Sequence, residues 1–513
     1  MRECSRTEYS LLNIFVGLGG YVLNTVLGFI CRMVFVRCLS ADYLGVNGLF
    51  SNILIMLSLA ELGVGSAVVY ALYKPLAEHD EEKIASLVKL YGKAYRTIGI
   101  IIGIVGIFLM PFLNVIITEQ PDIKENIYLL YIINLFNTAG SYFFSYRSSL
   151  LCAAQQNYIV GGLNYVVTIV QSVVQMIWLM LTHNYLGYLL IQTIGTFVYN
   201  IMISHVVVKK YPYIKKKDIT PLSKEETKGL FKNVRDLMIY KISSLLVNST
   251  DNILITFFNG LTTTGVASNY TLLINTIGTL LGNVFNGITA SVGNHNVLET
   301  DKKRYEMFSF LNLMNFWIYG WATVGIVFCS SDIVKLCFGS EYVLDSKIPI
   351  VLAINFFIVG MLNAVWMYKN TLGLFRYGKF MQMILGIINI ILSVIFGEMW
   401  GLFGILFATT ISRILTTTWY DPYVIFKHGF QKSPFLYLKK YCYYLVVLSL
   451  ATVCCYITFN LLGGSLIIRV LLKIIVCSII VNFIFYIAFH RTTEFGKVKA
   501  VVKSIVGIVY RKL

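Results

Sequence analysis

The sequence predicts an all-α polytopic membrane protein of about 14 transmembrane helices. Of its 513 residues, 57% are hydrophobic and only 13% are charged, whereas soluble domains carry about 25% charged residues. The mean hydropathy is +0.72, and apolar runs of membrane-spanning length recur along the chain. The 42 Lys and Arg exceed the 25 Asp and Glu. In a soluble protein that excess of positive charge would suggest binding to nucleic acid. In a membrane protein, the location of the basic residues first indicates which loops are cytoplasmic.

Apolar runs of about 18–25 residues, separated by polar breaks, define the expected spans. An even number of spans places both termini on one side of the membrane. The first run follows a basic start and lacks a small-residue cleavage site, so we expect a retained signal anchor. The fourteen expected spans are 11–31, 47–71, 97–117, 127–147, 158–181, 186–207, 237–258, 266–289, 308–329, 348–368, 380–397, 401–420, 441–461 and 466–489.

The distribution of basic residues orients these spans. If the N-terminus is placed inside, 34 of the 42 Lys and Arg lie in cytoplasmic segments. The positive-inside rule therefore predicts that both termini are cytoplasmic. The longest outer loop runs only from Ser330 to Lys347, which is too short for a separate external domain. Inside, the loop 208–236 and the tail 490–513 have the pattern of basic amphipathic helices on the inner leaflet. For the loop, a solvated helix is an equal alternative.

An internal repeat with an offset near 220 residues predicts two lobes of the same membrane orientation. Leu44-Gly45-Val46 resembles Thr264-Gly265-Val266, and Tyr146-Arg147 resembles Tyr368-Lys369. Six spans separate the copies, so a central cavity between two six-helix lobes is expected. The predicted divisions are a cytoplasmic N-terminus 1–10, an N-lobe 11–207, an inter-lobe loop 208–236, a C-lobe 237–420, two further helices within 441–489, and the tail 490–513.

Polar side chains inside the apolar runs mark a candidate cavity, since a charge in hydrocarbon costs at least about 2.5–3.5 kcal/mol. Cations there suit an anionic substrate, and a guanidinium can bind two phosphate oxygens at once. For the amides, packing between helices is the alternative, and Lys241 could instead extend to the inner interface. The candidate substrate-binding residues are Arg32, Arg413, Lys241, Asn24, Asn248 and Asn283, and the candidate ion-coupling or ion-pairing residues are Asp251 and Glu61.

The sequence contains no recognisable enzyme or metal pattern. A phosphate-binding G-x-x-x-x-G-K-[ST] loop is missing, and the six histidines lie at or beyond the expected membrane edges without paired metal spacing. The ten cysteines contain no C-x-x-C pair and fall mostly in apolar runs. We therefore expect no catalytic activity, no cofactor and no metal.

A family resemblance lies in the segments that surround the first repeat motif and its second copy. Tyr43-Leu-Gly-Val-Asn-Gly-Leu-Phe-Ser-Asn52 leads into Leu59-Ala-Glu-Leu-Gly-Val-Gly-Ser66, and Thr250-Asp-Asn-Ile-Leu-Ile255 precedes the second copy. These segments resemble Wzx-type oligosaccharide flippases, which belong to the multidrug/oligosaccharidyl-lipid/polysaccharide exporter superfamily. The resemblance implies a V-shaped fold of two six-helix bundles.

The first expected span also looks like the first-helix motif of the lipid II flippases, which share that superfamily. The matching residues are Gly28-Phe-Ile-Cys-Arg32. In that group the arginine lies in the cavity and is needed, so the resemblance makes Arg32 the first candidate for binding a lipid pyrophosphate. The acidic residue that follows the arginine in that group is Met33 here. Its coupling role therefore does not transfer.

The resemblance implies a flippase that moves undecaprenyl-pyrophosphate-linked oligosaccharide units from the inner to the outer leaflet by alternating access. Its setting would be surface polysaccharide or exopolysaccharide biosynthesis at a bacterial cytoplasmic membrane. The implied partners are that lipid-linked oligosaccharide, membrane lipid, H+ or Na+, and the polysaccharide polymerase and glycosyltransferases, with no nucleic acid. One alternative is a cation-coupled multidrug exporter of the same superfamily, which would favour acids in the cavity. Another is a polyprenyl-linked glycan polymerase or glycosyltransferase, which would need a substantial outer loop.

Overall fold

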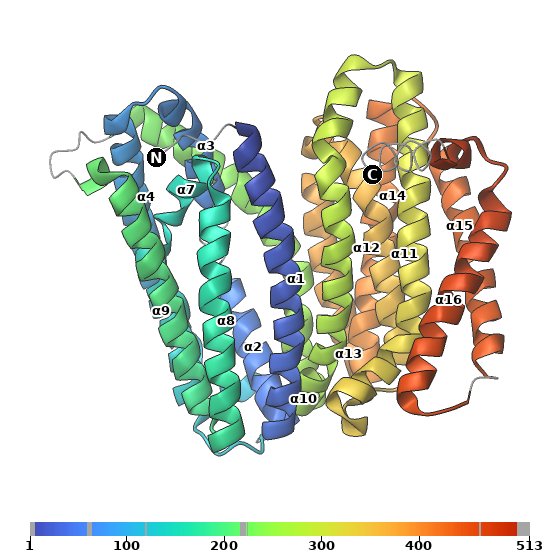
Figure 1. Ribbon diagram of the computed structural model, residues 1–513, viewed down its shortest axis with the longest axis horizontal. Helices are drawn as coiled ribbons and strands as arrows, with labels where there is room; N and C mark the ends of the chain where they lie inside the picture. The colour runs from blue at the N-terminus through green and yellow to red at the C-terminus, as the bar shows by residue number, and fades with distance from the viewer. Residues whose placement is uncertain are drawn as a thin grey trace, which may run out of the picture. The chain divides into compact units, whose positions relative to one another are not determined.

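The computed structural model describes residues 6–58, 64–117, 121–215, 222 and 224–499 except 461 and 462. Every regular element within them is helical, which confirms the all-α fold class. The chain divides into two compact units, Met1–Gly265 and Val266–Leu513. Figure 1 shows both units and labels most of their α-helices. The division into six-helix lobes around the loop 208–236 remains a prediction.

The first unit consists of long helices joined by short connections. Polar side chains fix several helix starts by accepting hydrogen bonds from the first turn: Asp80 from the amide of Lys83, and Asn126 from the amide of Tyr128. The elements are α1 (Arg6–Cys38), α2 (Ala41–Leu57), α3 (Val64–Ala77), α4 (Glu81–Leu109), η2 (Met110–Phe112), α5 (Leu113–Ile116), α6 (Ile127–Ser145), α7 (Ser148–Ala153), α8 (Asn157–Thr182), α9 (Tyr185–Lys210), η3 (Pro212–Lys215) and the part of α10 (Lys224–Leu298) up to Gly265.

The second unit has the same construction, with a five-residue π-helix near its middle. Its elements are the rest of α10, then α11 (Asp301–Phe338), η4 (Ser340–Tyr342), α12 (Lys347–Thr371), η5 (Leu374–Gly378), α13 (Lys379–Leu415), α14 (Thr417–Val424), the π-helix η6 (Ile425–Gly429), α15 (Phe435–Phe459) and α16 (Leu466–Phe489).

Ten helical runs in the described residues are long and apolar enough to cross a membrane, so the chain is a multi-pass membrane protein. Fourteen spans were expected. The difference arises because Phe380–Gly429 is one continuous run that holds two expected spans, and because α10, which is not among the ten, holds two more. The expected span 47–71 covers the end of α2, which ends at Leu57, and the start of α3 at Val64, while residues 59–63 between them lie outside the described part of the chain.

The chain reverses direction inside α10 and α13 at a single glycine each. Gly260 has φ 81° and ψ 169°, and Gly401 has φ 57° and ψ −135°, both conformations that favour glycine. Across the first break the hydroxyls of Thr256 and Thr264 are 2.9 Å apart, although eight residues of straight helix would span about 12 Å. Each break therefore turns the chain sharply without a separate loop.

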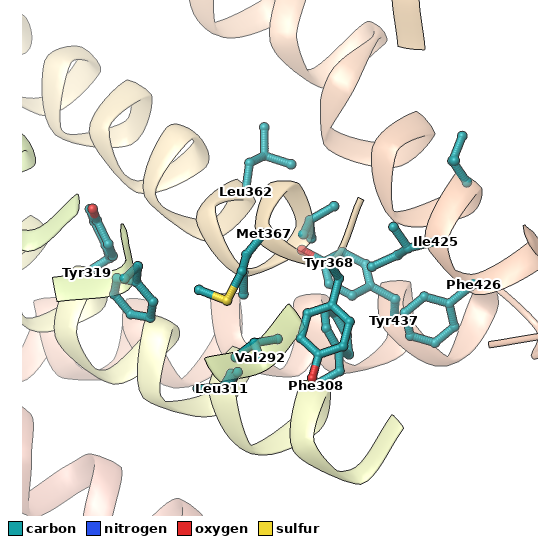
Figure 2. Close-up of a cluster of buried hydrophobic side chains, with 14 of the residues drawn as sticks. Val292, Phe308, Leu311, Tyr319, Leu362, Met367, Tyr368, Ile425, Phe426 and Tyr437 are labelled. Carbon is teal, nitrogen blue, oxygen red and sulfur yellow. The ribbon is translucent and has the colours of Figure 1, made fainter. Parts of the chain in front are cut away.

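The core of the second unit is rich in aromatic side chains. Figure 2 shows Phe308 of α11, Tyr368 of α12, Phe426 of η6 and Tyr437 of α15 gathered in one cluster. Phe308 packs edge to face on Tyr368 with ring centroids 5.1 Å apart, and Phe426 does the same on Tyr437 at 5.9 Å. This cluster fixes the end of α12 against the π-helix.

The start of the basic tail packs on the second unit. Residues 493–499 are helical, and the ring of Phe495 stacks on Trp317 of α11 at 5.6 Å. Glu494 accepts from Lys440 at 2.6 Å, and Lys497 donates to Glu306 at 2.9 Å. Residues 500–513 lie outside the described part of the chain, as does Ser223, with which the expected amphipathic segment of the loop 208–236 begins.

Candidate functional site

Arg32 lies in a cluster of aromatic side chains in the first unit. It is half-buried near the end of α1, and its charge is close enough to interact with Tyr185 and Tyr188 at the start of α9. These two rings stack with centroids 5.9 Å apart, and Phe35, one turn beyond Arg32, meets Tyr188 edge to face at 5.3 Å. The guanidinium is therefore next to two tyrosines on a helix distant in sequence.

A carboxylate, that of Glu125, belongs to the same cluster. Tyr43 packs on Tyr185 with ring centroids 5.0 Å apart and donates its hydroxyl to Glu125 at 2.5 Å. The backbone amide of Lys124 donates to the Tyr43 hydroxyl at 3.1 Å. The segment before α6 is thus tied to α2, and its carboxylate is held by the tyrosine hydroxyl. The cluster presents a cation, a carboxylate and flat aromatic surfaces within one unit.

Sequence patterns did not predict a role for the tyrosines of this cluster, because they are neither charged nor part of a polar stripe within an expected span. Tyr185 and Tyr188 follow directly after a turn in which His183 has φ 52° and Asn184 caps α9 by accepting from the amide of Gly187. That helix start brings the two rings towards α1. The local signal was Tyr185-Leu-Gly-Tyr188, two aromatic residues one turn apart next to a capping asparagine.

The other candidates of the first unit are Asn24, Asp251, Lys241, Asn248 and Glu61. Asn24 is on α1, and its buried Oδ1 has no hydrogen-bond partner among the described residues. Asp251 is half-buried on α10 before the reversal at Gly260. Lys241 and Asn248 lie on α10, but their side chains are outside the described part of the chain, and Glu61 lies outside it altogether. The roles of all five residues remain predictions.

The second unit contains Asn283 and Arg413. Both are half-buried, Asn283 on the later part of α10 and Arg413 in the last turn of α13. The helix breaks just after the arginine: its carbonyl accepts from the amide of Thr416 at 3.3 Å and from the hydroxyl of Thr418 at 2.8 Å. Arg32 and Arg413 belong to different units, so their joint use in one cavity remains a prediction.

A polar cluster that the sequence analysis did not select joins the two halves of α13. The amide nitrogen of Asn389 donates to the hydroxyl of Thr409 at 2.9 Å. The Asn389 Oδ1 and the Ser393 hydroxyl are buried and have no hydrogen-bond partner among the residues that the structure describes. The cluster therefore has acceptor oxygens to spare within a membrane-spanning hairpin. It was missed because no charge accompanies it.

The second repeat motif comprises Tyr146-Arg147 in the first unit and Tyr368-Lys369 in the second. In each unit its basic side chain bonds to a residue of another helix. Arg147 donates to the hydroxyls of Tyr146 and of Ser204 on α9. Lys369 donates to Asp421 of α14 at 2.5 Å, with their side chains 8% and 1% exposed, and Trp366 donates to the same carboxylate at 2.9 Å. The sequence placed Lys369 in a cytoplasmic turn, but it is buried, because Asp421 supplies the counter-charge.

No family model and no curated protein matches the sequence. A solved structure of the lipid II flippase MurJ in an inward closed conformation is similar with a TM-score of 0.66 and 16% identity, over 94% of this chain and 100% of that one. An inward-facing multidrug resistance MATE family transporter of the MOP superfamily is similar with a TM-score of 0.54 and 13% identity, over 76% of this chain and 91% of that one.

The chain shares its fold with these solved structures. A MATE transporter from Vibrio cholerae is also similar, with a TM-score of 0.50 and 12% identity, over 84% of this chain and all of that one. At these identities the likeness establishes the fold alone. The structures compared are a flippase and transporters. Among the described residues, no group of three or more His, Cys, Asp and Glu is arranged to hold a metal ion.

Proposed function

We propose that the chain is a flippase that moves undecaprenyl-pyrophosphate-linked oligosaccharide units from the inner to the outer leaflet of a bacterial cytoplasmic membrane. The units would serve surface polysaccharide biosynthesis, and transport would proceed by alternating access of the two units. The observation that carries the proposal is the half-buried Arg32 beside Tyr185 and Tyr188, in a chain whose fold matches a lipid II flippase over nearly its full length.

The chemistry of that cluster suits a charged glycolipid head. A guanidinium forms paired, charge-assisted hydrogen bonds to pyrophosphate oxygens, and it keeps its charge at every physiological pH. Aromatic rings offer flat apolar surfaces on which the carbon face of a sugar can pack. A drug cation would gain nothing from Arg32. The position of this cation therefore supports an anionic lipid-linked substrate.

The proposal is tested by transport into proteoliposomes. The probe is a short-chain, fluorescent polyprenyl-pyrophosphate oligosaccharide whose exposure is read with a membrane-impermeant glycosidase. Arg32→Ala is expected to lower the initial rate about 10- to 100-fold, because a charge-assisted hydrogen bond contributes about 1.5–3 kcal/mol. Arg32→Lys keeps the charge without the planar fork, so an intermediate rate is expected.

The matched control is Arg37→Ala, which removes an exposed arginine from the last turn of the same helix. Its rate should equal that of the original protein. Undiminished transport by Arg32→Ala would exclude the pyrophosphate assignment. If the original protein moves no lipid-linked oligosaccharide at all, the proposed function is wrong.

A cation-coupled multidrug exporter is the second candidate, because MATE transporters share the fold. It would use Asp251 or Glu61 to exchange H+ or Na+ for a drug. Drug-dependent proton or sodium flux in the same proteoliposomes, lost in Asp251→Asn, would favour it. The MATE likeness extends over 76% of this chain and the flippase likeness over 94%, so the flippase is the first choice.

A further inference from the structure

We propose that the second unit binds one anionic phospholipid in an apolar pocket beside an ion cluster, independently of the transported substrate. The pocket lies between α11, α16 and the later part of α10, and has a volume of about 230 Å³. Side chains that line it include Trp321, Ile326 and Ile333 of α11, Ile474 and Ser478 of α16, and Leu273 of α10. Its wall is almost entirely apolar, so it suits a hydrocarbon chain.

Three charged side chains lie directly beside the pocket. Asp332 of α11 accepts from Arg469 at 2.9 Å and from Lys473 at 2.7 Å, both on α16. Two cations share one carboxylate, which leaves one positive charge in excess. The Arg469 Nε is buried and meets no acceptor among the described residues, while the side chain as a whole is 36% exposed. The cluster therefore retains a donor and a net charge for an anion.

The pocket and the cluster are continuous along both helices. Ile333 follows Asp332 in sequence, and Ile474 follows Lys473. From Asp332 to Trp321 at the far end of the pocket, α11 rises about 16 Å. One leaflet of a bilayer core is about 15 Å thick, half of about 30 Å. A lipid whose phosphate meets Arg469 would therefore lay one acyl chain along the pocket within a single leaflet.

This geometry favours an anionic phospholipid over other anions. A free phosphate has no chain to fill the apolar pocket. A zwitterionic phospholipid brings a cation of its own next to Arg469 and Lys473. The cluster lies in the first turns of α16 and the last turns of α11, close to the helix ends where lipid headgroups lie at a membrane surface. The predicted topology puts this end at the outer leaflet.

Trp321 makes the pocket measurable, because bromine on an acyl chain quenches tryptophan fluorescence on contact. The full-length protein is placed in bilayers with brominated phosphatidylglycerol in ordinary phosphatidylcholine, and with the labels exchanged. Subtraction of a Trp321→Phe variant isolates the signal of this tryptophan. We expect at least threefold more quenching of Trp321 by the brominated anionic lipid than by the brominated zwitterionic lipid at equal mole fraction.

Variants of the cluster test the charge argument. Arg469→Gln combined with Lys473→Met should make the quenching by the anionic and the zwitterionic lipid equal. Asp332→Asn should increase the preference for the anionic lipid, since this substitution raises the net positive charge of the cluster. Lys335→Gln removes an exposed lysine from the last turn of the same helix and should leave the preference unchanged. Thermal unfolding verifies that each variant is folded. If the double variant is not folded, the lipid preference of Asp332→Asn, compared with that of the original protein, decides whether the charge argument holds.

Three outcomes would overturn the proposal. Equal quenching by the two headgroups in the original protein would mean an unselective apolar surface. An undiminished preference in the folded double variant would exclude the ion cluster as the binding group. Stronger quenching by a brominated polyprenyl phosphate than by phosphatidylglycerol would assign the pocket to the transported lipid instead. Loss of oligosaccharide transport in Arg32→Ala bears on none of these, so the two proposals fail separately.

Discussion

Gly45 and Gly265 lie backbone against backbone, although 220 residues separate them in the sequence. A Cβ added to Gly265 would lie 2.2 Å from the carbonyl oxygen of Ala41 and 2.9 Å from the amide nitrogen of Gly45. A Cβ at Gly45 would lie 2.0 Å from the carbonyl oxygen of Leu261. The two glycines are equivalent positions of the internal repeat. Neither position therefore has room for a side chain.

The first prediction concerns this contact. Gly265→Ala should destabilise the protein by about 1–3 kcal/mol, because the new methyl group meets backbone atoms that cannot move aside as a side chain can. The measurement is the midpoint of thermal unfolding in detergent. Gly48→Ala is the matched control, since an added Cβ there meets nothing within 4 Å. Equal midpoints for the two variants would contradict the close approach.

The second prediction concerns the buried pair of Lys369 and Asp421. Asp421→Asn keeps the shape but leaves a buried ammonium without a counter-charge, so a loss of about 3–5 kcal/mol in the free energy of unfolding is expected. Adding Lys369→Met should recover most of it, because no charge is then buried. Asp301→Asn, in an exposed pair with Arg304, should cost less than about 1 kcal/mol. Additive losses in the double variant would contradict the coupling.

The third prediction separates the ring of Tyr188 from its hydroxyl. Tyr188→Phe keeps the stack with Tyr185 and should transport the lipid-linked probe at nearly the original rate. Tyr188→Leu removes the ring beside Arg32, and the rate should fall about 2- to 10-fold, in line with about 0.5–1.5 kcal/mol for an aromatic contact. If both variants lose the same activity, the hydroxyl and not the aromatic surface is the important group.

The fourth prediction is a pH dependence of tail packing. Burial alone would raise the pKa of Glu494, but hydrogen bonds from Lys440, its own backbone and Thr493 hold the pKa below the ordinary 4.5. The carboxylate therefore stabilises the packed tail above that ordinary value, and the contribution is lost as the pH falls through the lower pKa of the folded state. Hydrogen exchange in 493–499 should rise on acidification below about pH 4.

The control for this prediction is Glu494→Gln, which removes the titrating group while keeping a similar shape. In that variant the exchange of 493–499 should already be raised at neutral pH and should change less on acidification. The ring of Phe495 still packs on Trp317 in both proteins, so the helix should not be lost entirely. An unchanged acid response in the variant would assign the effect to another group.

The helices were predictable because apolar runs of membrane-spanning length need no tertiary information. The end of α2 at Leu57 was not, since the residues around it are equally apolar. Reversal at Gly260 and Gly401 was equally hidden: neither position has a polar loop, and only the backbone angles reveal it. Hydropathy measures how long an apolar run is, and a turn made by one glycine leaves such a run uninterrupted.

The candidate site was only partly predictable for a related reason. Arg32 was selected because a charge in an apolar run is conspicuous, whereas Tyr185 and Tyr188 look like ordinary membrane residues until the fold brings α9 to α1. Asp332 was taken as part of an outer loop, and its two partners on α16 lie more than 130 residues away. Pairings over such distances depend on helix packing, which single-residue patterns do not encode.

The single-glycine reversal of α10 has a consequence for how the chain enters the bilayer during synthesis. The two arms of this hairpin share a turn at Gly260, and no Asp, Glu, Lys or Arg occurs from Asn252 to Leu298. Neither arm can be held at the far surface by its own flanking charges. We therefore expect both arms to insert together, with their orientation set by the basic residues that precede Lys241 and follow Leu298.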